Sequence, residues 1–196
     1  MSTVKREILP QYHFFYIQSM LFNTKSAINS LELVGEFIKS LHLGPQSTTK
    51  EKMSSILDEL QNIVINAAAL SKYFWPVRKQ HSWRGDALKL VFDIQENSVL
   101  ESRVIRDKIE HFDERLDKYL ESNVVGAIIP EFIGVSDNDL DSTYGGTHMF
   151  RAFFIDIEAF SILGENYDIK PIAEEIRRIH KKLEYFENNG YRFQVN

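Results

Sequence analysis

The chain has 196 residues, 43% of them hydrophobic and 26% charged, which is the length and composition of a globular protein with one domain. The 23 Lys and Arg residues are outnumbered by 28 Asp and Glu residues, and the formal net charge of -5 argues against a broad basic surface for duplex nucleic acid. There is no cysteine, which excludes disulfides, thiolate zinc sites, iron–sulfur clusters and cysteine nucleophiles.

Apolar residues three, four or seven positions apart predict two long amphipathic helices in the first part of the chain. The first spans about 11–42 and ends before Gly44 and Pro45, and the second spans about 49–75 and ends at Pro76. Both helices carry one apolar stripe, so we expect each to bury one face.

The next part of the chain predicts a loop and two further helices. Residues 77–85 are polar and aromatic and indicate a loop, after which Asp86 is expected to cap a short helix that ends near residue 94. A third long helix is expected over about 98–122, where Ser98 and Glu101 are spaced as a capping box.

The last third of the chain has a different character. Residues 123–147 contain four Gly, one Pro and an acidic tract, which indicates an irregular connection. Two aromatic and β-branched runs at 149–155 and 159–163 predict a β-hairpin, because only three residues separate them. Pro171 then begins a final amphipathic helix that extends to about Asn188.

These elements predict a mainly α protein, an antiparallel helical bundle with a small C-terminal β-hairpin and a final helix. We expect a single domain over residues 1–196, with its helical core at about 11–122 and the loop, hairpin and last helix at about 123–196. The sequence shows neither a signal-peptide pattern nor the roughly 18 apolar residues that a membrane span needs. We therefore expect a cytoplasmic protein that makes no membrane contact.

The third long helix holds the best candidates for chemistry. Its expected buried stripe consists of Ile105, Ile109, Phe112, Leu116 and Tyr119. At about 100° per residue, Arg106 and His111 fall outside this stripe, on the face turned to solvent or to a partner. Asp107 precedes His111 by four positions, so the two side chains are neighbours on the helix surface and can hydrogen-bond.

An arginine and a histidine on one exposed face are sufficient for cleavage of RNA without a metal. The Arg106 guanidinium suits a phosphate oxygen, and the imidazole of His111 can move a proton near neutral pH while a 2′-hydroxyl attacks. The opposite interpretation is a solvated helix face stabilised by charge pairs, because the spacing of Arg and His alone is common by chance. The six histidines are scattered and match no metal-ligand motif, so we expect no metal and no cofactor.

Three segments carry a resemblance to a known family: ALSKYFWP at 69–76, WRGDAL at 83–88 and SRVIRDKIEHFDERLD at 102–117. Together they resemble a bacterial branch of the HEPN superfamily. Its members are all-α domains whose shared motif is an Arg, a polar residue, and a His four to six positions after the Arg. Arg106, Asp107 and His111 match this motif, and the resemblance covers about residues 11–120.

The resemblance implies a metal-independent ribonuclease whose site forms where the two protomers of a homodimer meet. It also implies an RNA substrate and, since many members act in toxin–antitoxin or phage-defence systems, an antitoxin or other protein partner. Arg106 would position the scissile phosphate, His111 would transfer the proton and Asp107 would orient His111. Arg103 and Arg115 are expected to contribute positive charge toward the substrate beside the acidic residues of this face.

The alternative is a non-catalytic module that docks a protein or a nucleotide on the charged face of the same helix. The superfamily contains inactive members, and the face is acidic as well as basic, so both hypotheses stay open.

Two groups of aromatic residues are compatible with both hypotheses. Four aromatic residues at positions 12, 14, 15 and 16 either bind a partner or pack against the hairpin, and Trp83 either stacks on a base or covers the bundle end, with Gly85 in a turn.

Overall fold

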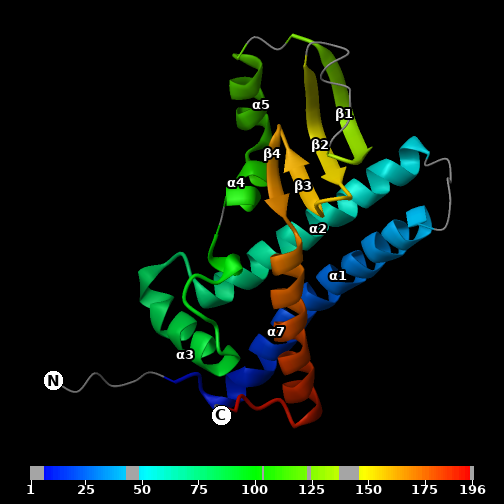
Figure 1. The fold of residues 1–196 in the computed structure, drawn as a ribbon. Coiled ribbons are helices and arrows are strands. Elements are labelled where there is room, and N and C mark those ends of the chain that lie inside the picture. The colour runs from blue at the N-terminus through cyan, green and yellow to red at the C-terminus, as the bar shows by residue number, and fades with distance from the viewer. Residues whose placement is uncertain (1–6, 43–48, 103, 123–124, 137–145, 195–196) are drawn as a thin grey trace. The chain divides into compact units, whose positions relative to one another are not determined.

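A computed structural model describes residues 7–42, 49–102, 104–122, 125–136 and 146–194. The chain divides into two compact units. The first unit comprises Met1–Asn29, Ile63–Arg103 and Ile172–Asn196, and the second comprises Ser30–Asn62 and Val104–Pro171. The protein is mainly helical, with a four-stranded mixed sheet near its C-terminus and a helix after the sheet (Figure 1).

The two long helices of the first part of the chain are confirmed. Helix α1 spans Pro10–His42 and helix α2 spans Lys50–Phe74, within one residue of the predicted limits at both ends. They pack antiparallel, because residues early in α1 meet residues late in α2: Ser19 hydrogen-bonds Tyr73, and Asn66 Nδ2 donates to Ser26 Oγ at 3.2 Å.

The final helix is also confirmed. Helix α7 spans Lys170–Asn188 with Pro171 in its first turn, where a missing N–H costs nothing. The predicted apolar face is buried in full: Ile172, Ile176, Ile179, Leu183 and Phe186. Within the first unit, α7 runs antiparallel to α1, since Gln18 donates to Glu187 at 3.0 Å and Thr24 contacts His180 Nδ1 at 2.9 Å.

The predicted loop at 77–85 is wrong in its second half. A 3-10 turn, η1, spans Lys79–His81, and helix α3 then spans Ser82–Phe92, so that Asp86 lies inside this helix and is not its cap. Gly85 is not in a turn but buried within α3. A Cβ there would lie 2.4 Å from the carbonyl oxygen of Phe74, so the glycine allows α3 to touch the end of α2.

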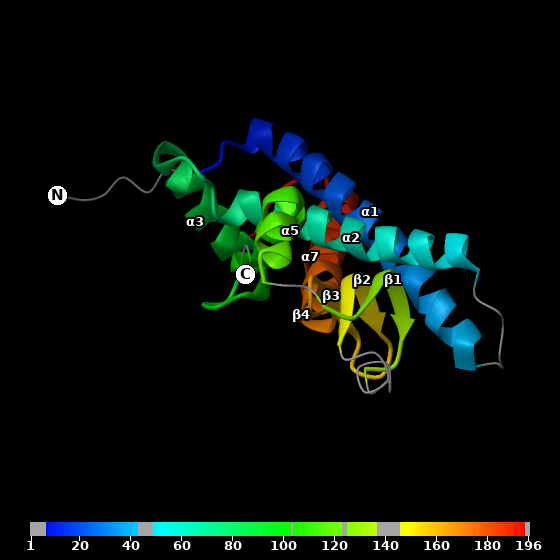
Figure 2. The same cartoon turned by 90° about the horizontal axis from the view of Figure 1, so that it is seen from above.

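The second unit contains the sheet, which has the strand order β1-β2-β3-β4 (Figures 1 and 2). Strands β2 and β3, Thr147–Phe154 and Ala159–Ile162, pair antiparallel and confirm the predicted hairpin. Strand β4, Glu165–Asp168, adds a short antiparallel strand to it, and strand β1, Ala127–Gly134, pairs with β2 in parallel. The interpretation of 123–147 as irregular is therefore wrong for 127–134.

One face of the sheet meets helices of the same unit. The strand registers place Arg151 opposite both Glu131 and Ile162, and Ile162 opposite Glu165, so these side chains share a face. On that face Glu131 accepts a hydrogen bond from Ser54 of α2, and Arg151 Nε donates to Gln61 of α2 at 3.3 Å.

The prediction of one continuous helix over about 98–122 is wrong. The chain instead forms a 3-10 turn, η2, at Val99–Glu101, then helix α4 at Val104–Glu110 and helix α5 at Phe112–Leu120. Ser98 does act as a cap, but of the 3-10 turn: its hydroxyl accepts from the N–H of Leu100 at 3.4 Å. None of the helices in the described ranges combines the length and apolar character needed to cross a bilayer.

Candidate functional site

His111 lies at the junction of α4 and α5. Its backbone has φ -115° and ψ 40°, which is outside the helical region and ends α4. Hydrogen bonds still connect the two helices, because the N–H of His111 donates to the carbonyl of Asp107 and the N–H of Arg115 donates to the carbonyl of His111, both at 3.1 Å. The histidine is therefore held by its backbone at a bend between two short helices.

The imidazole of His111 points outward, as the face argument expects. Its side chain is 57% exposed, and Nδ1 lies 3.7 Å from Oε1 of Glu114, which is also exposed. This separation is too long for a hydrogen bond and describes a loose surface ion pair. Glu114 is thus a partner that the sequence did not indicate, and the expected pairing of the ring with Asp107 stays a prediction.

The arginines of the predicted site are described to different extents. Arg106 lies in α4, five positions before His111, and its side chain lies outside the described part of the structure. Arg103 lies wholly outside the described residues. Arg115 is exposed on α5. The structure thus brings the imidazole of His111 and the guanidinium of Arg115 to the surface of neighbouring turns.

The buried face of this segment differs from the predicted stripe. Ile109, Phe112, Leu116 and Tyr119 are only half-buried, and Ile105 is described in its backbone alone. Among the side chains of α4 and α5 that the structure describes, Lys108 is the buried one, at 6% exposed. The reason is that α4 and α5 lie on the sheet, where Lys108 reaches β4 and the ring of Phe112 lies 4.4 Å from the Arg151 guanidinium of β2.

Lys108 forms an ion pair between α4 and the sheet. Its Nζ lies 2.7 Å from Oε1 of Glu165 and 5.9 Å from the centre of the Tyr167 ring. The hydrogen bond from Lys108 lowers the pKa of the Glu165 carboxyl, with smaller contributions from the Tyr167 hydroxyl and from the charge of Arg115. Burial, and then the hydrogen bond to Glu165, raise the pKa of Tyr167. The cluster is a structural anchor rather than a reactive site, since its groups already satisfy one another.

Glu165→Gln is expected to lower the free energy of unfolding by about 1 kcal/mol at neutral pH, because it leaves the Lys108 ammonium buried without its counter-charge. The carboxylate is 65% exposed, so solvent reduces the cost from that of a fully buried pair. Lys108→Met is expected to cost less, since it removes the buried charge itself. The measurement is urea unfolding, with the same change at the exposed Glu36 as a control.

The lowered pKa of Glu165 gives this prediction a pH dependence. The ionised form is favoured in the folded state, so its contribution is complete above the ordinary value of 4.5 and is lost as the pH falls through the lower, folded-state pKa. Stability of the wild type should therefore fall more steeply than that of Glu165→Gln below about pH 4.5. Parallel curves for the two proteins would contradict the prediction.

A second polar cluster joins α5 to β2 and was missed in the sequence. Nε2 of His148 lies 3.1 Å from the carbonyl oxygen of Val125, and Nδ1 lies 2.6 Å from the hydroxyl of Tyr119. A carbonyl only accepts, so Nε2 carries the proton and Nδ1 accepts from Tyr119. Burial raises the pKa of Tyr119, so the phenol stays protonated and donates. These two hydrogen bonds hold the first residues of β2 in place. Both ring nitrogens of His148 are engaged, so neither is available to transfer a proton to a substrate.

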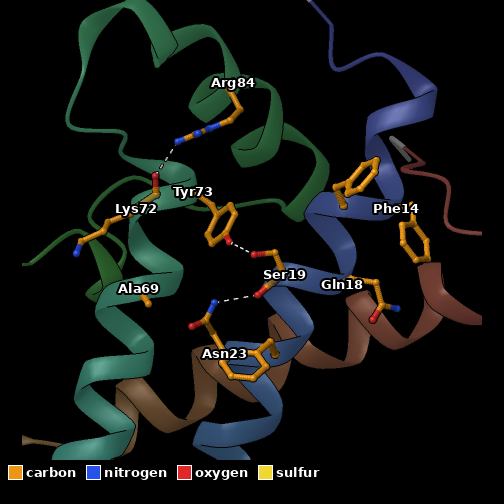
Figure 3. A pocket seen from close by; sticks show the side chains of 10 residues that line it. Phe14, Gln18, Ser19, Asn23, Ala69, Lys72, Tyr73 and Arg84 are labelled. Atoms are coloured by element: carbon orange, nitrogen blue, oxygen red, sulfur yellow. Dashed lines mark hydrogen bonds between the residues drawn. The ribbon is translucent and has the colours of Figure 1, made fainter.

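A groove of ≈ 900 Å³ lies in the first unit, between α1, α2 and α3 (Figure 3). Phe14 and Phe15, two of the four aromatic residues expected to bind a partner or to pack on the hairpin, line this groove. Six side chains characterise it, four rings and two cations: Phe14, Phe15, Phe22, Tyr73, Lys72 and Arg84. Tyr73 is held by Ser19, and Nη2 of Arg84 donates to the carbonyl oxygen of Lys72 at 2.9 Å.

Within the described ranges, no three His, Asp or Glu side chains come together in a way that could hold an ion. Comparison of the chain with protein-family models, with curated proteins and with solved structures finds no match.

Proposed function

We propose that the protein is a metal-independent endoribonuclease with an antiparallel helical bundle of the HEPN type. Its site contains His111 and Arg106 and is completed by a second copy of the chain. The observation that carries this proposal is the exposed imidazole of His111 at the α4–α5 junction, five positions after Arg106. A histidine at such a junction is available to a substrate, in contrast to His148, whose two ring nitrogens are both engaged.

The chemistry requires only a base, an acid and a cation. The imidazole of His111 takes the proton of a 2′-hydroxyl while its oxygen attacks the neighbouring phosphorus, and the bond from phosphorus to the 5′-oxygen breaks. The leaving oxygen receives a proton from the protonated His111 of the second copy, and a guanidinium stabilises the charge that develops on phosphate. The products are a cyclic phosphate and a 5′-hydroxyl.

A second copy is part of the proposal because the surface around His111 is acidic. Glu110, Asp113, Glu114 and Asp117 are all exposed within two turns of the histidine. A phosphate approaching one copy meets these carboxylates, at a cost that is largest at low ionic strength. A facing copy brings the same carboxylates, so the proposal requires that its Arg106 and Arg115 lie nearer to the phosphate than its Glu and Asp side chains do.

The test is cleavage of single-stranded RNA in EDTA. The wild type is expected to cleave, and His111→Ala is expected to lose cleavage while retaining its fold by circular dichroism, because the proton carrier is gone. His81→Ala, a histidine of η1 in the first unit, serves as the matched control and should cleave like the wild type. Equal and negligible cleavage by wild type and His111→Ala would overturn the enzyme proposal.

The exposed carboxylates around His111 favour a second candidate, a non-catalytic module that docks a partner on α4 and α5. Here the same face would bind a basic protein surface, and the acidic residues would help binding instead of opposing it. This candidate predicts no RNA turnover by the wild type and a stable complex that weakens in His111→Ala. The two candidates are therefore separated by the turnover measurement on the wild type alone.

A further inference from the structure

The groove of the first unit is lined by an exposed aromatic stripe. Phe15 and Phe22 of α1 are 66% and 76% exposed, and seven positions, two helical turns, separate them. Phe14, whose ring lies 4.8 Å from that of Tyr191, borders the same groove. Aromatic side chains of this size, exposed together along one helix, are typical of a surface that another molecule covers.

The shape of the groove suits a helix. It follows the antiparallel pair α1 and α2, with positions 15, 18, 19 and 22 of α1 on one side and positions 69, 72 and 73 of α2 on the other. Phe15 and Phe22 are therefore about 10 Å apart along the axis, at 1.5 Å per residue. An amphipathic helix places its own apolar anchors at i, i+3, i+4 and i+7, which is the same span.

The charge of the groove determines the chemistry of its occupant. Lys72 and Arg84 border it, and none of the described residues that line it carries a carboxylate. Nε of Arg84 is buried and has no hydrogen-bond partner in the described part of the chain, while Nη2 is engaged by a backbone carbonyl. Because Nε is closed to solvent, an occupant meets the positive charge of Arg84 and Lys72 rather than a free donor, and this charge favours carboxylates once the surface is covered.

We infer that this groove binds an acidic amphipathic helix of a partner protein, with apolar side chains on Phe15 and Phe22 and carboxylates on Lys72 and Arg84. A second copy of the same groove fits less well, because two such surfaces would bury their cations together without a carboxylate between them. Single-stranded RNA also fits less well, since two cations give little phosphate affinity at physiological salt. The inference is independent of His111 and of ribonuclease activity.

The experiment is a selection of displayed peptides of random sequence against the full chain, with Phe22→Ser as the counter-selecting protein. The enriched peptides are expected to carry apolar residues at helical spacing and Asp or Glu beside them. By fluorescence anisotropy, Phe15→Ser and Phe22→Ser should each weaken the enriched peptide about tenfold or more. Val77→Ser, an exposed apolar residue of the same unit that does not line the groove, should bind like the wild type.

A charge exchange tests the acidic character of the occupant. Lys72→Glu should weaken the enriched peptide, and a peptide with Lys in place of its Glu should regain affinity for that variant. Enrichment of peptides without acidic residues would overturn the inference. It would also be overturned if no enriched peptide bound more weakly to Phe15→Ser and Phe22→Ser than to the wild type. A dimer that dissociates in Phe22→Ser, or an oligouridine probe that loses binding in Phe22→Ser, would overturn it in favour of a second copy or of RNA.

Discussion

Phe92→Ala is expected to lower the free energy of unfolding by about 3–5 kcal/mol, the range for truncation of a buried aromatic side chain. Phe92 is fully buried at the end of α3. Its ring meets Phe74 and Phe186 edge-to-face at 5.7 Å and Phe193 at 6.1 Å, so one side chain joins α2, α3, α7 and the C-terminal segment. Alanine leaves a cavity at the centre of these rings, which the surrounding helices cannot close without losing other contacts.

The measurement is the midpoint and slope of urea unfolding at a fixed pH. Leu90→Ala, in the same helix but 51% exposed, is the matched control and is expected to change the free energy by less than about 1 kcal/mol. Equal losses in the two variants would show that α3 contributes to stability as a helix only, and that the aromatic cluster is not the core of the first unit. The carbonyl oxygen of Phe92 also accepts from Arg178 Nη1, and alanine preserves this bond.

The helices that the sequence predicted correctly are those whose burial follows their own periodicity. In α7, Ile172, Ile176 and Ile179 are buried because one face of the helix packs on one neighbouring surface. In α1 and α2 the stripe is long enough for the pattern to be unambiguous, and Pro76 ends the second helix. For such helices the local pattern and the tertiary environment agree.

The elements that the sequence missed depend on partners far away in the chain. Strand β1 contains Pro130, which argues against a central strand, but β1 lies at an edge of the sheet, where a missing N–H is tolerated. Strand β4 is short and mostly exposed, so it has no apolar pattern of its own. The third helix breaks at His111 because its two halves lie on a sheet, a support that the periodicity of this segment cannot indicate.

In the candidate site, too, features that follow from local sequence were predicted, and contacts between distant residues were missed. The outward direction of His111 follows from the position of one residue on one helix, and the structure agrees with it. The pairing of Lys108 with Glu165 and of Tyr119 with His148 joins residues that are far apart in the sequence, and no local spacing predicts either contact. A buried Lys108 is also the opposite of what a lysine directly after Asp107 suggests, since its partner Glu165 is supplied by a strand.

Gly85→Ala is expected to lower the free energy of unfolding by about 2 kcal/mol, although alanine favours helix formation. The new methyl group would lie 2.4 Å from the carbonyl oxygen of Phe74 and 2.7 Å from Cδ of Pro76. Both are parts of the main chain or of a ring fixed to it, so α3 must move away from the end of α2. This overpacking costs about 3 kcal/mol, and the helix propensity of alanine returns about 1 kcal/mol.

Gly35→Ala is the matched control, because Gly35 also lies within a helix and a Cβ there meets nothing within 4 Å. This variant is expected to gain about 0.5–1 kcal/mol from helix propensity alone. Opposite signs for the same substitution would separate the close approach of α3 to α2 from the intrinsic preference of the chain. Arg84 precedes Gly85 and reaches the Lys72 carbonyl across this contact, so Gly85→Ala should also weaken a peptide held in the groove, whereas Gly35→Ala should not.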